Sequence, residues 1–245
     1  TPVTASAFDI ARNRFATGHK NGSLIIRELR SGEETARFRP HARQVRSVAF
    51  SPDGKVIATS ATDGRVLLTA IDSGKMREMQ RPSSDPRTLV FSPDGKALYG
   101  SGWFMLYRWN PASGELASLK TEHRGIINNI QFTPDGQLAS ISRQTDSAVL
   151  FLDPLSGETS ARFQKHDLCG VAVNVSPDGR YLATTSDDAS VRIWKLEGPS
   201  RESRDLKKRR TCDVLVVAIS PSARRRNASV RSETSRRSRT CHPVE

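Results

Sequence analysis

The feature that most limits what this chain can fold into is a six-residue phrase that returns at a fixed spacing. "FSPDGK" occurs at 50–55 and again at 91–96, and the looser copies "FTPDGQ" and "VSPDGR" surround Asp135 and Asp178. The aspartates at 53, 94, 135 and 178 are 41, 41 and 43 residues apart, and "FDIARN" begins 42 residues before the first copy. A period of this length indicates an array of one supersecondary unit.

Each repeat has the chemistry of β-strands. In the second repeat, "VRSVAF" alternates apolar residues and leads into a Ser-Pro-Asp-Gly turn, where Pro suits the second position of a type I turn and Gly the left-handed position. The runs "KVIATS", "RVLLTAI" and "KMREMQ" follow, separated by turns at Asp63-Gly64 and at 72–74. Four short antiparallel strands without a helix predict one sheet per repeat, and stacked sheets of this kind make a β-propeller.

Over residues 3–198 the repeats resemble those of the WD-repeat propeller family, which carry a His near the start and a Trp-Asp near the end. The fifth repeat is the most complete: His166 lies nine residues before Val175, and "YLATTSDDASVRIWK" contains Trp194 with Lys195 in place of the family's Asp. The other repeats are degenerate. His41 and His123 keep the nine-residue offset, the third repeat has Pro82 there, and the Trp position reads Arg27, Thr69, Trp109, Leu152 and Trp194.

The resemblance implies a structural hydrogen-bond chain in each blade, running from Trp through Ser or Thr and His to Asp. The residues that it assigns are His166, Thr184, Asp188 and Trp194 in the fifth blade, His41, Thr59 and Asp63 in the second, and His123, Ser140 and Asp146 in the fourth. A His, a hydroxyl and a carboxylate can also form a nucleophilic triad, but a triad needs an oxyanion hole and an exposed nucleophile. Recurrence favours a scaffold, because an active site is normally built once, and we expect no catalytic residue.

We predict an all-β fold, a β-propeller of four-stranded antiparallel blades that is incomplete or open, with five clear blades in residues 1–198. Residues 199–245 are predicted to be a basic Arg/Ser-rich tail. Within it, 213–224 is a candidate first strand of a sixth blade, because "VLVVAISPSAR" places Ile219 44 residues after Val175. A genuine tail, an eroded blade and an out-of-frame end remain open as alternatives for this segment.

The positive charge of the chain is concentrated in the same segment. Residues 199–245 hold 13 Lys or Arg and 5 Asp or Glu, a net charge of +8 out of +12 for the whole chain. An argument for nucleic-acid binding therefore concerns the tail alone. The tail has no Phe, Tyr or Trp, so it lacks the side chains on which bases stack. Nucleic-acid binding is a disfavoured alternative, and so is a propeller-based hydrolase.

No residue pattern indicates a cofactor, a metal or a small-molecule ligand. The His residues fall in different repeats, the Gly residues fall at turns, and Cys169, Cys212 and Cys241 form no Cys-x-x-Cys pair. No apolar run approaches the roughly 18 residues that span a bilayer, and a secretory leader is either absent or lies outside this chain. We therefore expect a cytoplasmic protein that does not bind membranes.

The expected partners are other proteins or other domains of a longer parent chain. Loops that join the fourth strand to the next repeat should share one Lys- and Arg-rich rim with the turns between second and third strands. Trp103 falls in such a turn, and an exposed aromatic there can anchor a partner or fold over a neighbouring blade. The predicted partner-binding rim comprises Trp103, Arg43, Arg87, Arg124 and Lys165. This pattern favours a non-enzymatic protein–protein interaction scaffold.

Overall fold

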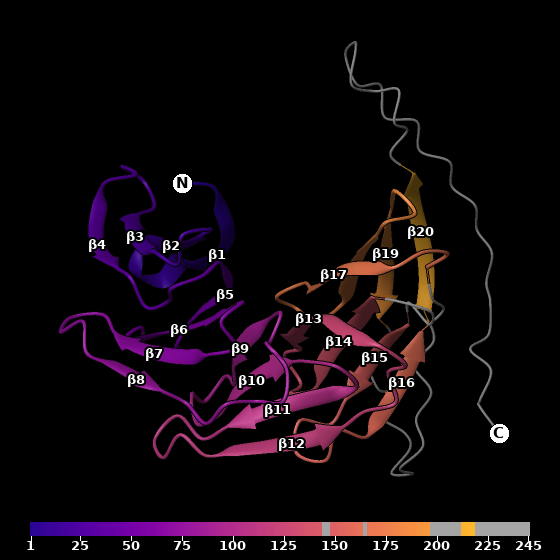
Figure 1. The fold of residues 1–245 in the computed structure, drawn as a ribbon. Helices are drawn as coiled ribbons and strands as arrows, with labels where there is room; N and C mark the ends of the chain where they lie inside the picture. Colours follow the sequence, from indigo (N-terminus) through magenta and orange to yellow (C-terminus); the bar gives the residue numbers. More distant parts are fainter. Residues whose placement is uncertain (144–147, 164–165, 197–211, 219–245) are drawn as a thin grey trace. The chain divides into compact units, whose positions relative to one another are not determined.

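The computed structural model describes residues 1–143, 148–163, 166–196 and, for the backbone alone, 212–218. Apart from the 3-10 helix Ile10–Arg12, the regular structure of these residues is all β, in five four-stranded antiparallel sheets (Figure 1). The strands of every sheet pair in chain order, so that each repeat of the sequence is one blade. The prediction of an all-β propeller built from four-stranded antiparallel blades is confirmed.

The chain divides into two compact units, Thr1–Lys120 and Thr121–Glu245. The first unit holds three blades. The first blade consists of β1 (Val3–Asp9), β2 (Arg14–His19), β3 (Leu24–Glu28) and β4 (Glu34–Phe38), and the second of β5 (Val45–Phe50), β6 (Val56–Ala61), β7 (Val66–Ala70) and β8 (Met76–Glu78). The third blade consists of β9 (Leu89–Phe91), β10 (Leu98–Ser101), β11 (Met105–Trp109) and β12 (Leu116–Lys120). The second unit holds two: β13 (Ile126–Phe132), β14 (Leu138–Arg143), β15 (Val149–Leu152) and β16 (Thr159–Phe163); and β17 (Gly170–Val175), β18 (Tyr181–Ser186), β19 (Ser190–Leu196) and β20 (Cys212–Ala218).

The repeated Ser-Pro-Asp-Gly phrase closes the first hairpin of a blade. In the second blade, the hydroxyl of Ser51 donates to Asp53 at 2.6 Å and accepts from the backbone N–H of Val56 at 3.0 Å, while Gly54 takes a φ of +68°. The same bonds recur in the third, fourth and fifth blades, with Thr133 replacing Ser in the fourth. The Ser-Pro-Asp-Gly motif recurs because each of these blades needs a turn between its first two strands that satisfies its own hydrogen bonds.

The hydrophobic cores lie between adjacent blades of a unit. Leu24 and Ile26 of the first blade share a core with Val45 and Ile57 of the second. Similar cores join Leu68 to Trp109 between the second and third blades, and Phe151 to Trp194 between the fourth and fifth. A single sheet cannot cover its own apolar faces, so stacking on a neighbour is what removes these side chains from water.

Polar side chains also tie the first strands of adjacent blades together. Thr4 donates to the carbonyl of Val45 at 2.7 Å, and Ser47 accepts from the N–H of Leu89 at 2.9 Å. In the second unit, the amide oxygen of Asn129 accepts from the N–H of Val173 at 3.1 Å. The first strand lies at the edge of its sheet, and these bonds satisfy backbone groups that the edge leaves without a strand partner.

The structure assigns a different role to the candidate sixth-blade strand. Cys212–Ala218 pairs with β19, from Ser190 opposite Ala218 to Leu196 opposite Cys212, as the fourth strand of the fifth blade. A fourth strand follows the third after a short turn in the other blades, whereas here fifteen residues, 197–211, intervene. The period and the Ser-Pro letters indicate a new blade, but the open edge of β19 takes the next apolar run as its partner. Residues 219–245 lie outside the described residues.

Candidate functional site

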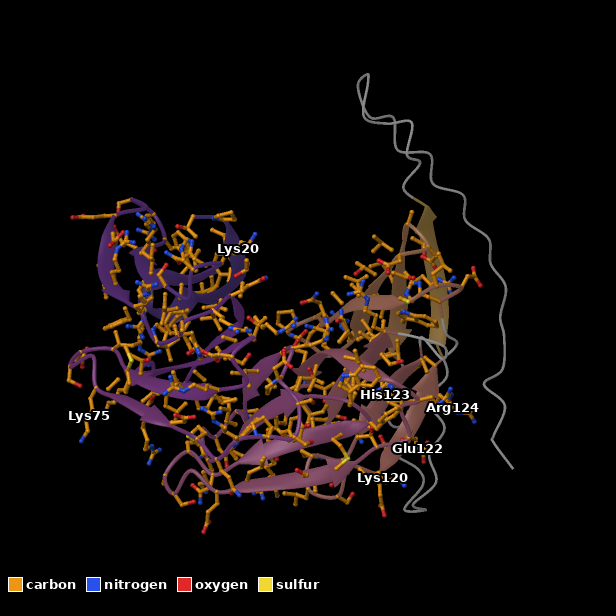
Figure 2. All side chains as sticks on the ribbon, viewed as in Figure 1. Lys20, Lys75, Lys120, Glu122, His123 and Arg124 are labelled. Carbon is orange, nitrogen blue, oxygen red and sulfur yellow. The ribbon has the colours of Figure 1, made fainter. Side chains whose placement is uncertain are left out.

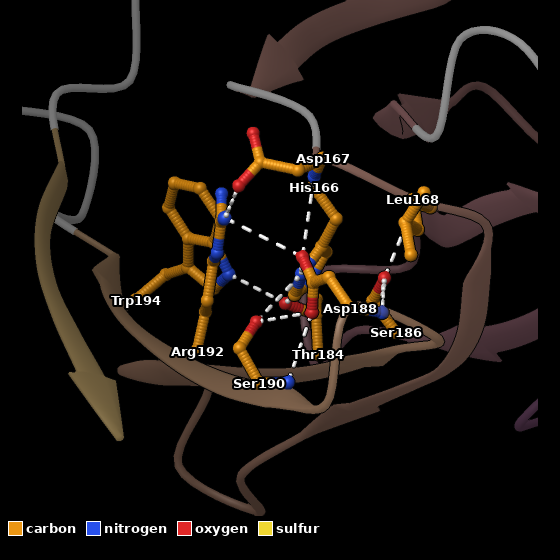
Figure 3. A network of polar contacts seen from close by, with 9 residues as sticks. All are labelled: His166, Asp167, Leu168, Thr184, Ser186, Asp188, Ser190, Arg192 and Trp194. Atoms are coloured by element: carbon orange, nitrogen blue, oxygen red, sulfur yellow. Dashed lines mark hydrogen bonds and ion pairs between the residues drawn. The ribbon is translucent and has the colours of Figure 1, made fainter. Parts of the chain in front are cut away.

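The most complete group of polar contacts lies in the fifth blade (Figure 3). His166 comes from the segment before β17, Thr184 from the middle of β18, Asp188 from the turn between β18 and β19, and Trp194 from β19. Trp194 Nε1 lies 2.9 Å from Thr184 Oγ1, which lies 2.8 Å from His166 Nε2, and His166 Nδ1 lies 3.0 Å from Asp188 Oδ2. The structure thus brings these four predicted residues together in one chain of contacts.

The chemistry of Trp fixes the direction of the protons along this chain. An indole N–H can only donate, so the Thr184 hydroxyl accepts from Trp194 and donates to Nε2 of His166. Nδ1 then carries the proton and donates to the Asp188 carboxylate. Burial lowers the pKa of His166, and its hydrogen bond to Asp188 offsets part of that effect. The imidazole is therefore neutral in the folded protein at neutral pH.

Asp188 is the centre of a second group of contacts. Its carboxylate accepts from the hydroxyl of Ser190 at 2.5 Å and from its N–H at 2.9 Å, and Arg192 approaches to 3.5 Å. Burial opposes ionisation, but the hydrogen bonds from Ser190 and His166 hold the pKa of Asp188 well below its usual range. With so many donors, this carboxylate locks the β18–β19 turn, and Thr184, which is fully buried, presents no surface to a substrate.

A shorter version of the chain lies in the second blade. His41 Nε2 is 2.9 Å from Thr59 Oγ1, and Nδ1 is 3.0 Å from Asp63. Burial lowers the pKa of His41 as well, against the opposing effect of Asp63. Thr69 stands at the Trp position and is fully buried, and its hydroxyl has no hydrogen-bond partner in the described part of the chain. The second blade therefore keeps the His, Thr and Asp contacts and lacks the fourth donor.

In the fourth blade, the contact between His123 and Ser140 lies within the described residues. His123 Nε2 lies 2.8 Å from Ser140 Oγ, and the hydroxyl of Ser140 donates to the carbonyl of Leu150 at 2.9 Å. Ser140 therefore accepts from Nε2 of His123, the reverse of the direction in the fifth blade. The predicted third member, Asp146, lies outside the described residues.

The first blade contains a His that the sequence analysis did not single out. His19 Nε2 lies 3.0 Å from Thr17 Oγ1, and Nδ1 lies 3.0 Å from the carbonyl of Thr1. Thr17 precedes Thr59 by 42 residues, so the repeat spacing alone could have identified it. The His reaches it from two residues further along β2 rather than from a preceding loop, and for that reason the family pattern does not contain it.

The third blade replaces the chain with a different set of bonds. Its Thr position is Gly100, where a Cβ atom would lie 2.8 Å from the Trp109 ring, and Trp109 instead donates to the carbonyl of Gln80 at 2.8 Å. The buried Tyr107 hydroxyl lies 2.8 Å from Ser83 Oγ and accepts from the N–H of Ser84 at 3.1 Å. These bonds fasten the loop between β8 and β9, as the His does in the second blade.

The predicted rim is assembled in the first unit by contacts between consecutive loops. His41 in the β4–β5 loop donates its N–H to Gly22 in the β2–β3 turn, and Thr62 in the β6–β7 turn donates to Gln44. In the same way, Arg87 in the β8–β9 loop donates to the carbonyl of Ser101, beside the β10–β11 turn. The hydroxyl of Ser60, just before the β6–β7 turn, donates to the carbonyl of Pro86 beside Arg87 at 2.9 Å, so Arg43, Arg87 and Trp103 belong to one connected rim. Arg124 is exposed on the second unit (Figure 2), and Lys165 lies outside the described residues.

Two negative findings apply to the described residues only. Within them, no three His, Cys, Asp or Glu side chains are grouped as a metal ion would require. In that same part of the chain, no helix has the length and apolar character needed to cross a membrane.

We expect the free energy of unfolding to fall as the pH is lowered from about 7.5 to about 5.5. The pKa values of His41 and His166 are lowered in the folded state, mainly by burial, so the unfolded chain binds protons more readily. The stability contributed by the neutral imidazoles is complete above the unfolded pKa of about 6.5 and is lost as the pH falls through it. Urea unfolding at a series of pH values measures this, and the variant His166→Ala should show a shallower slope. A flat profile would contradict the assignment of neutral histidines.

Comparison with known proteins connects the blades to a described family. The family model of the WD domain, G-beta repeat, matches residues 32–68 and 157–195. The beta subunit of the guanine nucleotide-binding protein of Arabidopsis thaliana is 25% identical over 211 residues, covering 80% of this chain and 55% of that protein. A subunit of chromatin assembly factor 1 from Mus musculus is 24% identical over 157 residues, covering 64% of this chain and 24% of that protein.

Solved structures share the fold. The β-propeller domain of Myceliophteria thermophila Cps50 (Swd1) superposes with a TM-score of 0.72 at 14% identity, covering 88% of this chain and 83% of that one. The beta subunit of the guanine nucleotide-binding protein of Oryza sativa subsp. japonica is 23% identical, and the chain spans about half of its length, 47%.

Proposed function

Because the chain belongs to the WD-repeat β-propeller family, we propose that it is a non-enzymatic scaffold that displays its rim loops to other proteins. One observation carries the proposal: the polar groups that could do chemistry are buried and bonded to one another, and the loops that they support end in exposed side chains. His41 and Asp63, for example, hold the loop in which Arg43 is exposed. Loops held in this way lose little conformational entropy when a partner binds.

Two further facts support a scaffold over an enzyme. The hydroxyl-bearing residues beside the histidines, Thr59, Ser140 and Thr184, are fully buried, whereas a hydrolase needs a nucleophile that a substrate can reach. Two of the relatives are named as subunits, one of a guanine nucleotide-binding protein and one of a chromatin assembly factor. A role within an assembly is therefore the function that we propose for this chain, with other proteins as its partners.

The five lysines of the first unit allow a direct test. All are exposed, but Lys20 and Lys120 lie at the predicted rim, whereas Lys55, Lys75 and Lys96 lie in the turns at the opposite ends of the strands (Figure 2 labels Lys20, Lys75 and Lys120). We expect a lysine-reactive cross-linker, applied in a cell lysate, to join partner proteins to the first pair and to leave the other three free. Mass spectrometry identifies the cross-linked sites. Cross-links spread evenly over all five would contradict binding through this rim.

A further inference from the structure

The β10–β11 turn of the third blade presents two large aromatic side chains to solvent. Trp103 is 45% exposed and Phe104 is 43% exposed, with their ring centroids 5.8 Å apart. The N–H of Gly102 donates to the carbonyl of Met105 at 3.0 Å, which closes the turn and places both rings at its tip. Two adjacent exposed aromatics at one tight turn are uncommon on a protein surface, because exposure of such rings is unfavourable.

The backbone of this turn is also strained. Phe104 has a φ of +56°, in the left-handed region that side chains other than Gly and Asn seldom adopt. In the first and second blades, the β2–β3 and β6–β7 turns use Gly22 and Gly64 for their positive φ. A Phe in this conformation costs stability, and strain of this kind is concentrated at binding sites. The β18–β19 turn of the fifth blade also takes a positive φ, at Ala189, so the conformation belongs to this type of turn, and what distinguishes the β10–β11 turn is the bulky, exposed Phe in that position.

The base of the turn is held rigidly. Tyr107, two residues after the turn closes, is fully buried and bonded through its hydroxyl to Ser83 and Ser84. On the other strand, the hydroxyl of Ser101 accepts from the N–H of Thr88 at 3.1 Å. The two rings are thus presented on a fixed support, which lowers the entropy lost when they are covered by a partner.

The rim of the first unit, to which this turn belongs, carries excess positive charge. Several of its arginines have acidic neighbours: Arg46 pairs with Asp85 at 2.7 Å, and Arg65 and Arg81 both pair with Glu78. In contrast, three exposed cations of the rim have no ion pair within the described residues: Lys20, Arg39 and Arg43. The first unit therefore offers an apolar tip on a rim that also carries unpaired cations.

We propose that the Trp103–Phe104 turn is the anchor of a docking site for an acidic peptide segment that carries an aromatic or branched aliphatic side chain. The inference rests on the proposed function and names the class of partner. The rings would pack on the apolar side chain, which removes three apolar surfaces from water, and the unpaired cations further along the rim would attract Asp and Glu residues of the same segment. A second copy of this chain fits less well, because it presents the same positive rim.

The three tryptophans of the chain make the test specific. Trp109 is fully buried and Trp194 is 1% exposed, so acrylamide quenching of tryptophan fluorescence reports mainly on Trp103. Random dodecapeptides displayed on phage are selected on the immobilised full chain, and enriched sequences are synthesised. We expect them to combine Asp or Glu with a Phe, Trp, Leu or Ile, and to protect Trp103 from acrylamide. Replacing the apolar residue of a peptide by Ser, or its acids by Lys, should abolish the protection.

Two variants and one control separate binding from folding. Trp103→Ala and Phe104→Gly should each weaken peptide binding roughly tenfold or more. Phe104→Gly should also leave the melting temperature unchanged or raised, because Gly relieves the positive φ. The control is Leu155→Ala, which removes another exposed apolar side chain, 66% exposed, from a turn of the second unit. It should bind the peptides as the wild type does.

The remaining outcomes each overturn the inference. Enriched peptides that lack acids or an apolar residue would reject the partner class. Peptides that bind with unchanged Trp103 quenching, but weaken with Arg43→Glu, would leave the proposed rim function standing and remove this turn as its anchor. Protection of Trp103 that depends only on protein concentration would show a second copy to be the occupant. If no peptide is enriched while cross-linking still finds protein partners at the rim, the anchor fails and the scaffold function does not.

Discussion

Gly22→Ala is expected to destabilise the first unit by about 2–5 kcal/mol. Gly22 has a φ of +85°, and a Cβ atom there would lie 2.0 Å from the carbonyl oxygen of His41. That carbonyl cannot easily retreat, because the His41 side chain is bonded to Thr59 and Asp63. The substitution therefore combines backbone strain with a clash between two blades. Urea unfolding followed by circular dichroism measures the loss.

Gly64→Ala is the matched control for this prediction. Gly64 has a φ of +75° in the corresponding turn of the next blade, but a Cβ atom there would meet nothing within 4 Å. Only the backbone cost of about 1–2 kcal/mol should remain. If both variants lost the same stability, contact between the first and second blades would have no part in the effect.

His166→Ala is expected to lower the free energy of unfolding by about 2–4 kcal/mol, because the buried Thr184 hydroxyl and the Asp188 carboxylate each lose a partner worth about 1–3 kcal/mol. Amide hydrogen exchange should rise in β17, β18 and β19 and stay unchanged in β5–β7 of the other unit. The control is Asp167→Ala beside it, whose carboxylate is 89% exposed and approaches Arg192 only to 3.5 Å. That change should stay within about 0.5 kcal/mol. An unfolding midpoint unaffected by His166→Ala would contradict the structural role of the chain of contacts.

Much of the fold could be predicted because its signals are local. The Ser-Pro-Asp-Gly turn satisfies its own hydrogen bonds within six residues, from Ser51 to Val56 in the second blade, so the same letters are needed in each blade. The His, Thr and Asp positions are likewise set by a fixed offset within one repeat. His41, Thr59 and Asp63 can be placed by counting, and the structure brings them within 3.2 Å of one another along the chain of contacts.

The contacts that the repeat spacing does not predict are made by residues that have no fixed type or position in the repeat. Tyr107 reaches Ser83 from 24 residues away, and the rings of Trp109 and Tyr107 occupy space that a Cβ atom at Gly100 or Gly102 would fill. The spacing of the repeats does not predict this arrangement, because the third blade replaces the His, the Thr and the Asp of the hydrogen-bond chain all at once. The candidate first strand of a sixth blade, 213–224, is affected for a related reason: fifteen residues lie between β19 and β20, where the other blades have five or six, and Cys212–Ala218 pairs with β19 in the fifth blade.

The side-chain bonds between first strands have a consequence for synthesis on the ribosome. Thr4 bonds to Val45, Ser47 to Leu89 and Asn129 to Val173, at sequence separations of 41, 42 and 44 residues. Each of these bonds joins a blade to the next one made, so the entropy of closing the intervening loop is nearly the same at every step. A blade can dock on its predecessor soon after it emerges, without waiting for distant sequence. Within each unit, the chain is thus suited to vectorial folding, in which only the newest sheet face stays uncovered at any moment of translation.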